Sequence, residues 1–361
     1  MLLMKYFHPG WKAVHISADE ARAQSAHDET MKAILELTQS QKNDLLCILE
    51  SVPGNPYEDH QSFVDSVALV AAPQFLVDAC GRIREDRESG ASEAHVVRNC
   101  PIDLIVPELD LDNPVADKYA KKNTFVAEAF LALVARLTET PLMSYGSRNN
   151  GDFFTDVIAI SRYSGMQTGF SDSELPFHND RTAHWARADF ISLLGLRCPQ
   201  EEVIYTTFVS GRSLLTHLNP QEQEILRKPY FLTSFDVFSR DTNGRQRVSD
   251  NHPILENDHS FRYLETTTTV APTAPGEAKD ALLSLKNALV VAAKQRHRIA
   301  VGDLLLFANQ DGLHSRDRIE IFDAERARAR WLLKTYAFRD EAAADRLADH
   351  WLDGVRGRID D

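Results

Sequence analysis

The chain has 361 residues, 43% of them hydrophobic, which is enough to bury a core in one large domain or two smaller ones. Its 53 acidic residues outnumber its 40 basic residues, and the formal net charge is −13. The charges are dispersed, which argues against nucleic acid or an anionic membrane as a partner, because both need a concentrated basic face.

The first 150 residues are predicted to be a mainly helical support region. Apolar residues recur at helical spacing between Ala18 and Arg87, as in the segments 31–37 and 45–49. Residues 86–92 are expected to form a solvated loop before a short apolar run that starts at His95. A further long helix is expected over residues 113–138.

From Asp152 onward the chain changes to short runs rich in β-branched and aromatic residues, which are typical of a sandwich or barrel. Helical insertions are expected at 219–227 and 276–293, and a terminal helix at about 341–355. We therefore predict one domain over 1–361, with a β core over 151–340 and a C-terminal helix over 341–361. The expected strands are 156–161, 188–196, 203–209, 230–235, 261–270, 304–309 and 331–338.

The cysteines and apolar stretches indicate the cellular setting. The four cysteines lie far apart with no Cys-x-x-Cys pair, and the opening residues do not resemble a secretion signal. The longest apolar stretches fall well short of the roughly 20 residues that span a bilayer. The sequence thus predicts a reduced cytoplasmic protein without a transmembrane helix.

One short motif has the composition of half a metal site. In an extended segment, alternation places His178 and Asp180 on one side, where an imidazole nitrogen and a carboxylate oxygen can reach one ion. The pattern is weak alone, because a similar copy occurs at 27–29 within a helical pattern.

A second pattern completes the set. Residues 302–314 read as a turn and a strand that delivers His314 to its far end. Two histidines and one carboxylate bind one face of an octahedral Fe(II) and leave three positions for cosubstrate and O2. The ligand set by itself also allows Zn(II) in a non-redox metal hydrolase.

Arg330 follows His314 by sixteen residues. The distal carboxylate of 2-oxoglutarate, whose other end chelates the metal, needs a planar bidentate partner such as a guanidinium. The alternative is that His314 and Arg330 are ordinary surface groups, because other arginines lie nearby.

Taken together, these residues resemble the clavaminate synthase-like branch of the Fe(II)/2-oxoglutarate oxygenases, within the taurine dioxygenase superfamily. The resemblance covers about residues 94–340. It rests on several ordered motifs: Gln167-Thr168-Gly169, the segment 177–197 around the metal motif, the segment 210–218, and 302–314 with Arg330-Trp331.

The resemblance implies an α+β fold with a double-stranded β-helix (jelly-roll, cupin-like) core and helices packed outside. It implies that His178, Asp180 and His314 bind Fe(II), that Arg330 binds 2-oxoglutarate, and that Thr207 contacts this cosubstrate. Related radical halogenases have Gly in place of the carboxylate. Asp180 therefore implies hydroxylation, with O2 consumed and succinate and CO2 formed.

The resemblance also points to a free L-amino acid as the substrate, lysine or another basic one first. For its α-carboxylate we consider Arg98 and Thr335, and for its ammonium group Glu174 and Trp351. Each of these residues could equally serve a structural or surface role, and Arg181 would repel a cation. A different small amine or carboxylate substrate, and assembly into homo-oligomers, stay open.

Overall fold

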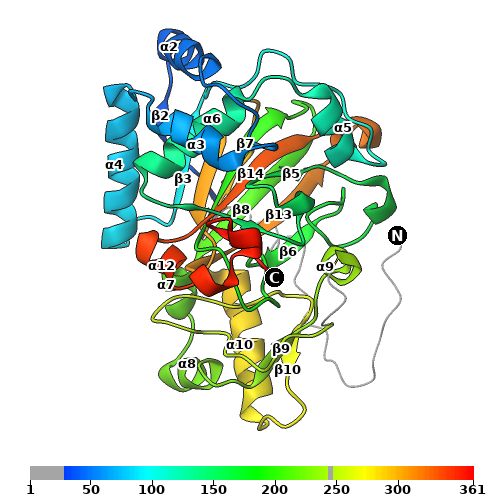
Figure 1. Ribbon diagram of the computed structural model, residues 1–361. Coiled ribbons are helices and arrows are strands. Elements are labelled where there is room, and N and C mark those ends of the chain that lie inside the picture. The colour runs from blue at the N-terminus through cyan, green and yellow to red at the C-terminus, as the bar shows by residue number, and fades with distance from the viewer. Residues whose placement is uncertain (1–27, 243–246) are drawn as a thin grey trace.

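The computed structural model describes residues 28–242 and 247–361, and Figure 1 shows a mixed α/β molecule with helices around central sheets. One main sheet has five strands. Strands β1 and β11 pair in parallel, and all other neighbouring strands in this sheet are antiparallel. In spatial order it contains β1 (Asp28–Thr30), β11 (Lys294–His297), β8 (Val203–Ser210), β13 (Gly312–Glu320) and β6 (Leu175–His178).

The second main sheet has eight strands and is mostly antiparallel. A separate two-stranded sheet pairs β9 (Phe231–Thr233) with β10 (Thr268–Val270). The eight-stranded sheet contains, in spatial order, β15 (Arg358–Ile359), β4 (Leu142–Tyr145), β14 (Trp331–Ala337), β7 (Phe190–Arg197), β12 (Leu304–Ala308), β3 (Ala94–Arg98) and β2 (Ala33–Glu36), while β5 (Phe154–Val157) also pairs with β14.

The eight-stranded sheet buries side chains on both faces. Side chains alternate between the two faces of a strand, so Leu304 and Leu306 join one hydrophobic cluster while Leu305 and Phe307 join another. Phe307 meets Phe208 of the five-stranded sheet, with ring centroids 5.9 Å apart. The two main sheets therefore face each other across this inner cluster.

Helices cover the outer face of the eight-stranded sheet (Figure 1). Nine consecutive residues of α6, from Val126 to Val134, are buried, and all of them except Glu128 are apolar, as expected for a helix surrounded by the core. The covering helices are α2 (Gln39–Glu50), α3 (His60–Ala68), α4 (Gln74–Ser89) and α6 (Val126–Leu137).

Both predicted helical insertions are confirmed, as α8 (Pro220–Leu226) and α10 (Glu277–Val291). With α7 (Gly211–Leu215) they form a third hydrophobic cluster that includes Val209 and Leu313 of the five-stranded sheet. Asn219 starts α8 with a capping box shared with Glu222. These helices lie at the lower end of the molecule in Figure 1.

Two N-terminal predictions were wrong in detail. Residues 33–36 of the supposed helical pattern form strand β2, which pairs in parallel with the edge of β3. The supposed loop at 86–92 begins as helix, because α4 continues to Ser89 and ends where Gly90 adopts a left-handed φ of 71°. The part of the pattern before residue 28 lies outside the described residues.

The long helix predicted over 113–138 is two helices, α5 (Pro114–Lys121) and α6. Between them the buried ammonium of Lys122 lies 2.9 Å from Asp103 and 2.8 Å from Glu128. An unpaired charge would be costly to bury, so these pairs hold the turn between the helices in place.

The C-terminal helix predicted over 341–361 is also wrong. Helix α12 (Glu341–Asp345) occupies only the start of this range, and two 3-10 turns and strand β15 follow. Asp353, Gly354 and Gly357 have φ values of 54°, 69° and 80°, which an α-helix cannot contain. The tail instead pairs with β4.

No helix in the described ranges 28–242 and 247–361 combines the length and the apolar composition needed to cross a bilayer.

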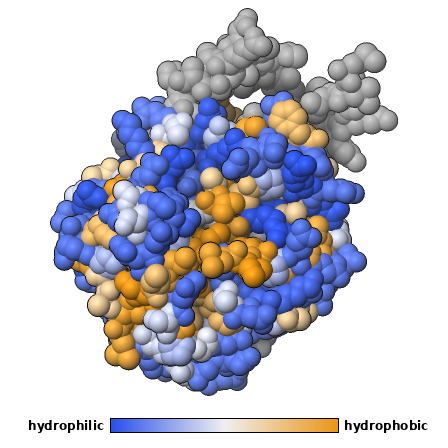
Figure 2. Space-filling model, turned by 90° about the horizontal axis from the view of Figure 1, so that it is seen from above, coloured by the Kyte–Doolittle hydropathy of each residue, from blue (hydrophilic) through white to orange (hydrophobic). Residues whose placement is uncertain are grey.

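Hydrophilic side chains cover most of the face seen in Figure 2, around one central apolar area. Among the large apolar side chains, Leu69 and Ile105 are exposed to 88% and 80%. Assembly into homo-oligomers stays a prediction.

Candidate active site

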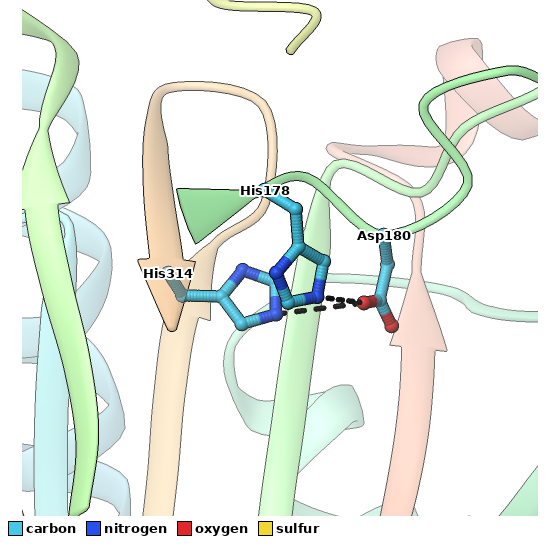
Figure 3. Close-up of side chains that lie close together, drawn as sticks. All are labelled: His178, Asp180 and His314. Carbon is cyan, nitrogen blue, oxygen red and sulfur yellow. Dashed lines mark ion pairs between the residues drawn. The ribbon is translucent and has the colours of Figure 1, made fainter. Parts of the chain in front are cut away.

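The sequence-predicted metal ligands meet at one point. His178 ends β6, and His314 lies opposite it on β13. Asp180 lies two residues after His178 in the sequence. Oδ1 of Asp180 is 3.4 Å from Nε2 of each histidine, and Figure 3 shows the three side chains converging. The three possible donor atoms all lie within 4.8 Å of one another, so they can hold one ion.

In His178 and Asp180, the second nitrogen or oxygen atom of the side chain is held by other groups. Nδ1 of His178 contacts the carbonyl of Pro176 at 2.8 Å, which leaves Nε2 with its lone pair. Oδ2 of Asp180 accepts hydrogen bonds from Lys334 Nζ at 2.7 Å and from the Tyr336 hydroxyl at 2.9 Å. These bonds orient one imidazole nitrogen and one carboxylate oxygen toward the same point.

The protonation states also suit a metal. Burial and the neighbouring His178 lower the pKa of His314 to about 4, so its imidazole is neutral at neutral pH. Burial alone would raise the pKa of Asp180, but Lys334 and the two histidines hold that pKa well below its ordinary value. A neutral imidazole and an ionised carboxylate are the forms that bind metal ions.

Two buried asparagines clamp the metal motif to the loop between β12 and β13. Asn179 donates to the carbonyls of Asn309 and Gly312, and its own side-chain oxygen accepts from the backbone of Tyr263 at 2.9 Å. Asn309 accepts from the backbone N–H of Asp180 at 2.8 Å and donates to Ala188 at 2.9 Å. The motif is thus held at both its middle and its last residue.

A cavity of about 290 Å³ opens beside the three side chains. Every second residue of strand β14 lines its wall, namely Leu332, Lys334 and Tyr336, and Arg330, just before the strand, continues the same alternation. The strand starts at Trp331, whose buried indole N–H donates to Asp156 at 2.9 Å. This bond fixes the chain one residue after Arg330.

Arg330 and Arg316 both line the cavity but differ in what they contact. Arg316 donates to backbone carbonyls, among them that of Ser171 at 2.9 Å. Arg330 has a buried Nη2 atom that contacts no acceptor in the described part of the chain. A buried donor of this kind is suited to an anionic ligand.

Thr207 does not line the cavity. Its hydroxyl donates to Asp317 at 2.5 Å, whereas the preceding residue, Thr206, lies in the cavity wall. Side chains alternate along β8, so neighbouring residues such as Thr206 and Thr207 point to opposite faces of the sheet.

The four residues considered for the substrate lie outside the cavity wall. Arg98 is half exposed on strand β3, 3.7 Å from Asp303, and Glu174 is exposed. Thr335 is buried on the face of β14 opposite Lys334, and Trp351 packs against the inner cluster from the C-terminal segment.

Other polar residues occupy the wall instead: Lys334, Arg148, Arg181 and Asp236. Alternation from Arg330 could have identified Lys334 from the sequence. Nothing in the local sequence marks Arg148 or Asp236, because long-range folding brings their loops together.

This cavity, with a two-histidine, one-carboxylate set at its wall, has the form of a non-haem iron oxygenase site. The family model of the taurine catabolism dioxygenase TauD, TfdA family matches residues 124–336, which is more than half of the chain. The chain belongs to this family.

Individual relatives agree with this assignment. The chain is 25% identical to an L-lysine 3-hydroxylase of Catenulispora acidiphila over 315 residues, which cover 83% of each protein. It is 26% identical to an L-asparagine oxygenase of Streptomyces coelicolor over 272 residues, covering 74% of this chain and 78% of that one. A solved asparagine oxygenase with Fe(II), 2S,3S-3-hydroxyasparagine and succinate matches with a TM-score of 0.75 at 22% identity, over 91% of this chain and 99% of that one.

The protein is therefore an Fe(II)/2-oxoglutarate-dependent dioxygenase, whose cofactors are Fe(II), 2-oxoglutarate and O2. Together these supply the oxidising power for the reaction, while the protein supplies binding, orientation and the exclusion of water.

Proposed function

We propose that the protein hydroxylates an unactivated C–H bond of a free L-amino acid. One atom of O2 enters the amino acid as a hydroxyl group, and the other enters succinate as 2-oxoglutarate loses CO2. The convergence of three donor atoms at the wall of a cavity of about 290 Å³ carries this proposal. A cavity of this size has room for small ligands rather than for a polymer.

In this proposal His178, Asp180 and His314 hold Fe(II), because their free donor atoms share one point. Asp180 fills the coordination position that a halide would need, and this favours hydroxylation over halogenation. Its contacts with Lys334 and Tyr336 keep the carboxylate ionised and fixed in orientation.

Arg330 is our candidate for binding the distal carboxylate of 2-oxoglutarate. Its unpaired, buried Nη2 atom and its place in the wall support this role. Thr206 replaces Thr207 as the candidate threonine beside the cosubstrate, because Thr206 faces the cavity.

Lys334 is the candidate for binding a carboxylate of the substrate. One of its three protons is directed to Asp180, and the others remain for a second acceptor. Lys334 takes over the role considered for Arg98 and Thr335, neither of which lines the cavity.

We further propose that the facing sheets are the two halves of a double-stranded β-helix and that residues 1–361 act as one domain. The contact between Phe208 and Phe307 joins the two sheets, and helices α2 to α4 and α6 share one cluster with the larger sheet. Both observations support a common core.

The direct test is incubation with individual L-amino acids, Fe(II), ascorbate and 2-oxoglutarate, followed by mass spectrometry. We expect one amino acid to gain one oxygen atom while succinate accumulates. Lysine and other basic amino acids are in the panel because of the family resemblance. No oxygenated product from any amino acid, despite binding of Fe(II) and 2-oxoglutarate, would contradict the proposal.

A further inference from the structure

The cavity wall is strongly cationic, although the chain as a whole has a net charge of −13. Six cationic side chains face two carboxylates, one of which, Asp180, belongs to the metal set. The cations are Arg148, Arg181, Arg240, Arg316, Arg330 and Lys334, and the carboxylates are Asp180 and Asp236.

Some of these cations already have a role. Arg316 is occupied by backbone carbonyls, and Arg330 is the proposed partner of 2-oxoglutarate. Arg240 is exposed. Three buried or half-buried cations, Arg148, Arg181 and Lys334, are left for the substrate.

Arg148 is held in a rigid position. Its Nη2 atom donates to the Ser239 hydroxyl at 2.7 Å and lies 3.3 Å from Asp236, and its guanidinium stacks 4.5 Å from the ring of Phe238. Its Nε atom is buried and has no acceptor among residues 28–242 and 247–361. The side chain of Arg148 is thus fixed in position, and its Nε atom can still donate a hydrogen bond to a ligand.

Arg181 is even more enclosed, with a side chain only 1% exposed. Nη2 pairs with Asp361 and contacts Nδ1 of His184 at 2.9 Å, and the guanidinium lies 4.3 Å from the ring of Tyr145. Its Nε and Nη1 atoms are buried without an acceptor in the part of the chain that the structure describes. Buried donors without partners are rare in folded proteins and point to a ligand that completes them.

We propose that the substrate is an L-amino acid with a carboxylate side chain, aspartate or glutamate, rather than lysine. One carboxylate pairs with Lys334, and the other accepts hydrogen bonds from Arg148 and Arg181. Asp236 is the only carboxylate of the described wall outside the metal set, and it receives the α-ammonium group. This inference rests on the proposed amino acid hydroxylation and specifies its substrate class.

The wall offers little to a basic side chain. A lysine or arginine substrate would bring two cationic groups to a wall whose guanidiniums at Arg148 and Arg181 already pair with Asp236 and Asp361. Among the described wall residues outside the metal set, Asp236 is the one carboxylate that could face either group. The cavity charge therefore favours an acidic substrate over the basic one expected from the sequence.

The test is a binding measurement by calorimetry under anaerobic conditions, with the Fe(II)- and 2-oxoglutarate-loaded protein. The probes are L-aspartate, L-glutamate, L-asparagine, L-lysine and L-arginine. We expect aspartate or glutamate to bind at least ~10-fold more tightly than lysine or arginine. A difference of this size corresponds to the contribution of about one charge-assisted hydrogen bond. Tighter binding of lysine or arginine would overturn the proposal.

Variants of Arg148 separate charge from structure. Arg148→Gln should weaken binding of the acidic amino acid by about 10-fold or more, and Arg148→Lys should restore part of it. Exposed Arg346→Gln is the matched control and should bind as the wild type does. Unchanged binding in Arg148→Gln would overturn the assignment.

The binding test and the hydroxylation test can fail independently of each other. If acidic amino acids bind selectively but none gains oxygen, the substrate-class inference stands and the proposed hydroxylation falls. If a basic amino acid is the one hydroxylated, the hydroxylation stands and this inference falls.

Discussion

Two groups of side chains line the cavity and are built differently. In the first group, His178 and His314 lie opposite each other on paired strands, and Arg330 immediately precedes the next inward-facing strand. In the second group, Arg148 and Arg181 come from turns and Asp236 from the segment after β9. Strand pairing positions the first group, whereas loops and side-chain contacts position the second.

This difference separates chemistry from specificity. Groups that must hold a metal in a fixed geometry gain from the rigid register of a sheet. Groups that select a substrate can change with the loops that carry them while the sheets stay the same. The predictions below test whether the strand-borne group and the loop-borne group act as separable units.

The largest effect is expected for the proposed metal ligands. His178→Ala or His314→Ala should abolish Fe(II) binding and turnover while the fold is kept, because both side chains project toward the metal position at the cavity wall. Iron content after reconstitution and circular dichroism measure the two properties. Succinate production by both variants would show that the ligand assignment is wrong.

A smaller but still large effect is expected for Arg330. Arg330→Lys keeps the charge but loses the planar fork, so the affinity for 2-oxoglutarate should fall by about 10- to 100-fold. The KM for 2-oxoglutarate measures this, with Arg346→Lys as the control. An unchanged KM for 2-oxoglutarate in Arg330→Lys would indicate that another arginine, such as Arg316, binds the cosubstrate.

The asparagine clamp should have an intermediate effect on the metal alone. Asn309→Ala removes the bond to the backbone N–H of Asp180, so the Fe(II) affinity should fall by roughly 10-fold. Metal titration measures this, and exposed Asn123→Ala serves as the control. A folded variant with the iron affinity of the wild type would show that the clamp does not position Asp180.

The smallest effect is expected outside the cavity. Arg98→Gln and Glu174→Gln should change the KM for the amino acid substrate by less than about twofold, because neither side chain faces the cavity. Steady-state kinetics tests both variants. A tenfold rise in KM for either one would return that residue to the substrate site.

The sequence grouped the residues on paired strands but said little about the loop-borne residues of the wall. The His-x-Asp spacing, the distant His314 and the later Arg330 form one constellation with a clear chemical meaning, and the structure brings them together. On β8 the structure turns Thr206 to the cavity and Thr207 to Asp317, because the sequence did not define which face of this strand points inward. Residues such as Arg148 could not be predicted, because contacts like its bond to Ser239 join residues far apart in the chain.

The fold was predictable to a similar extent. The insertions at α8 and α10 have strong helical patterns, and the structure has both. Strand β2 was misread because a stretch of four residues is too short to show a period, and its conformation depends on pairing with β3. The C-terminal segment was misread because its turns depend on contacts with β4.

The most direct test of the proposed hydroxylation uses isotopically labelled oxygen. The protein is supplied with Fe(II), 2-oxoglutarate and the amino acid panel under 18O2, and the products are analysed by mass spectrometry. The account predicts one labelled atom in the hydroxylated amino acid and one in succinate, and loss of both products in His314→Ala. A modified product whose new oxygen comes only from water, with no succinate formed, would contradict it and would instead indicate a non-redox metal hydrolase.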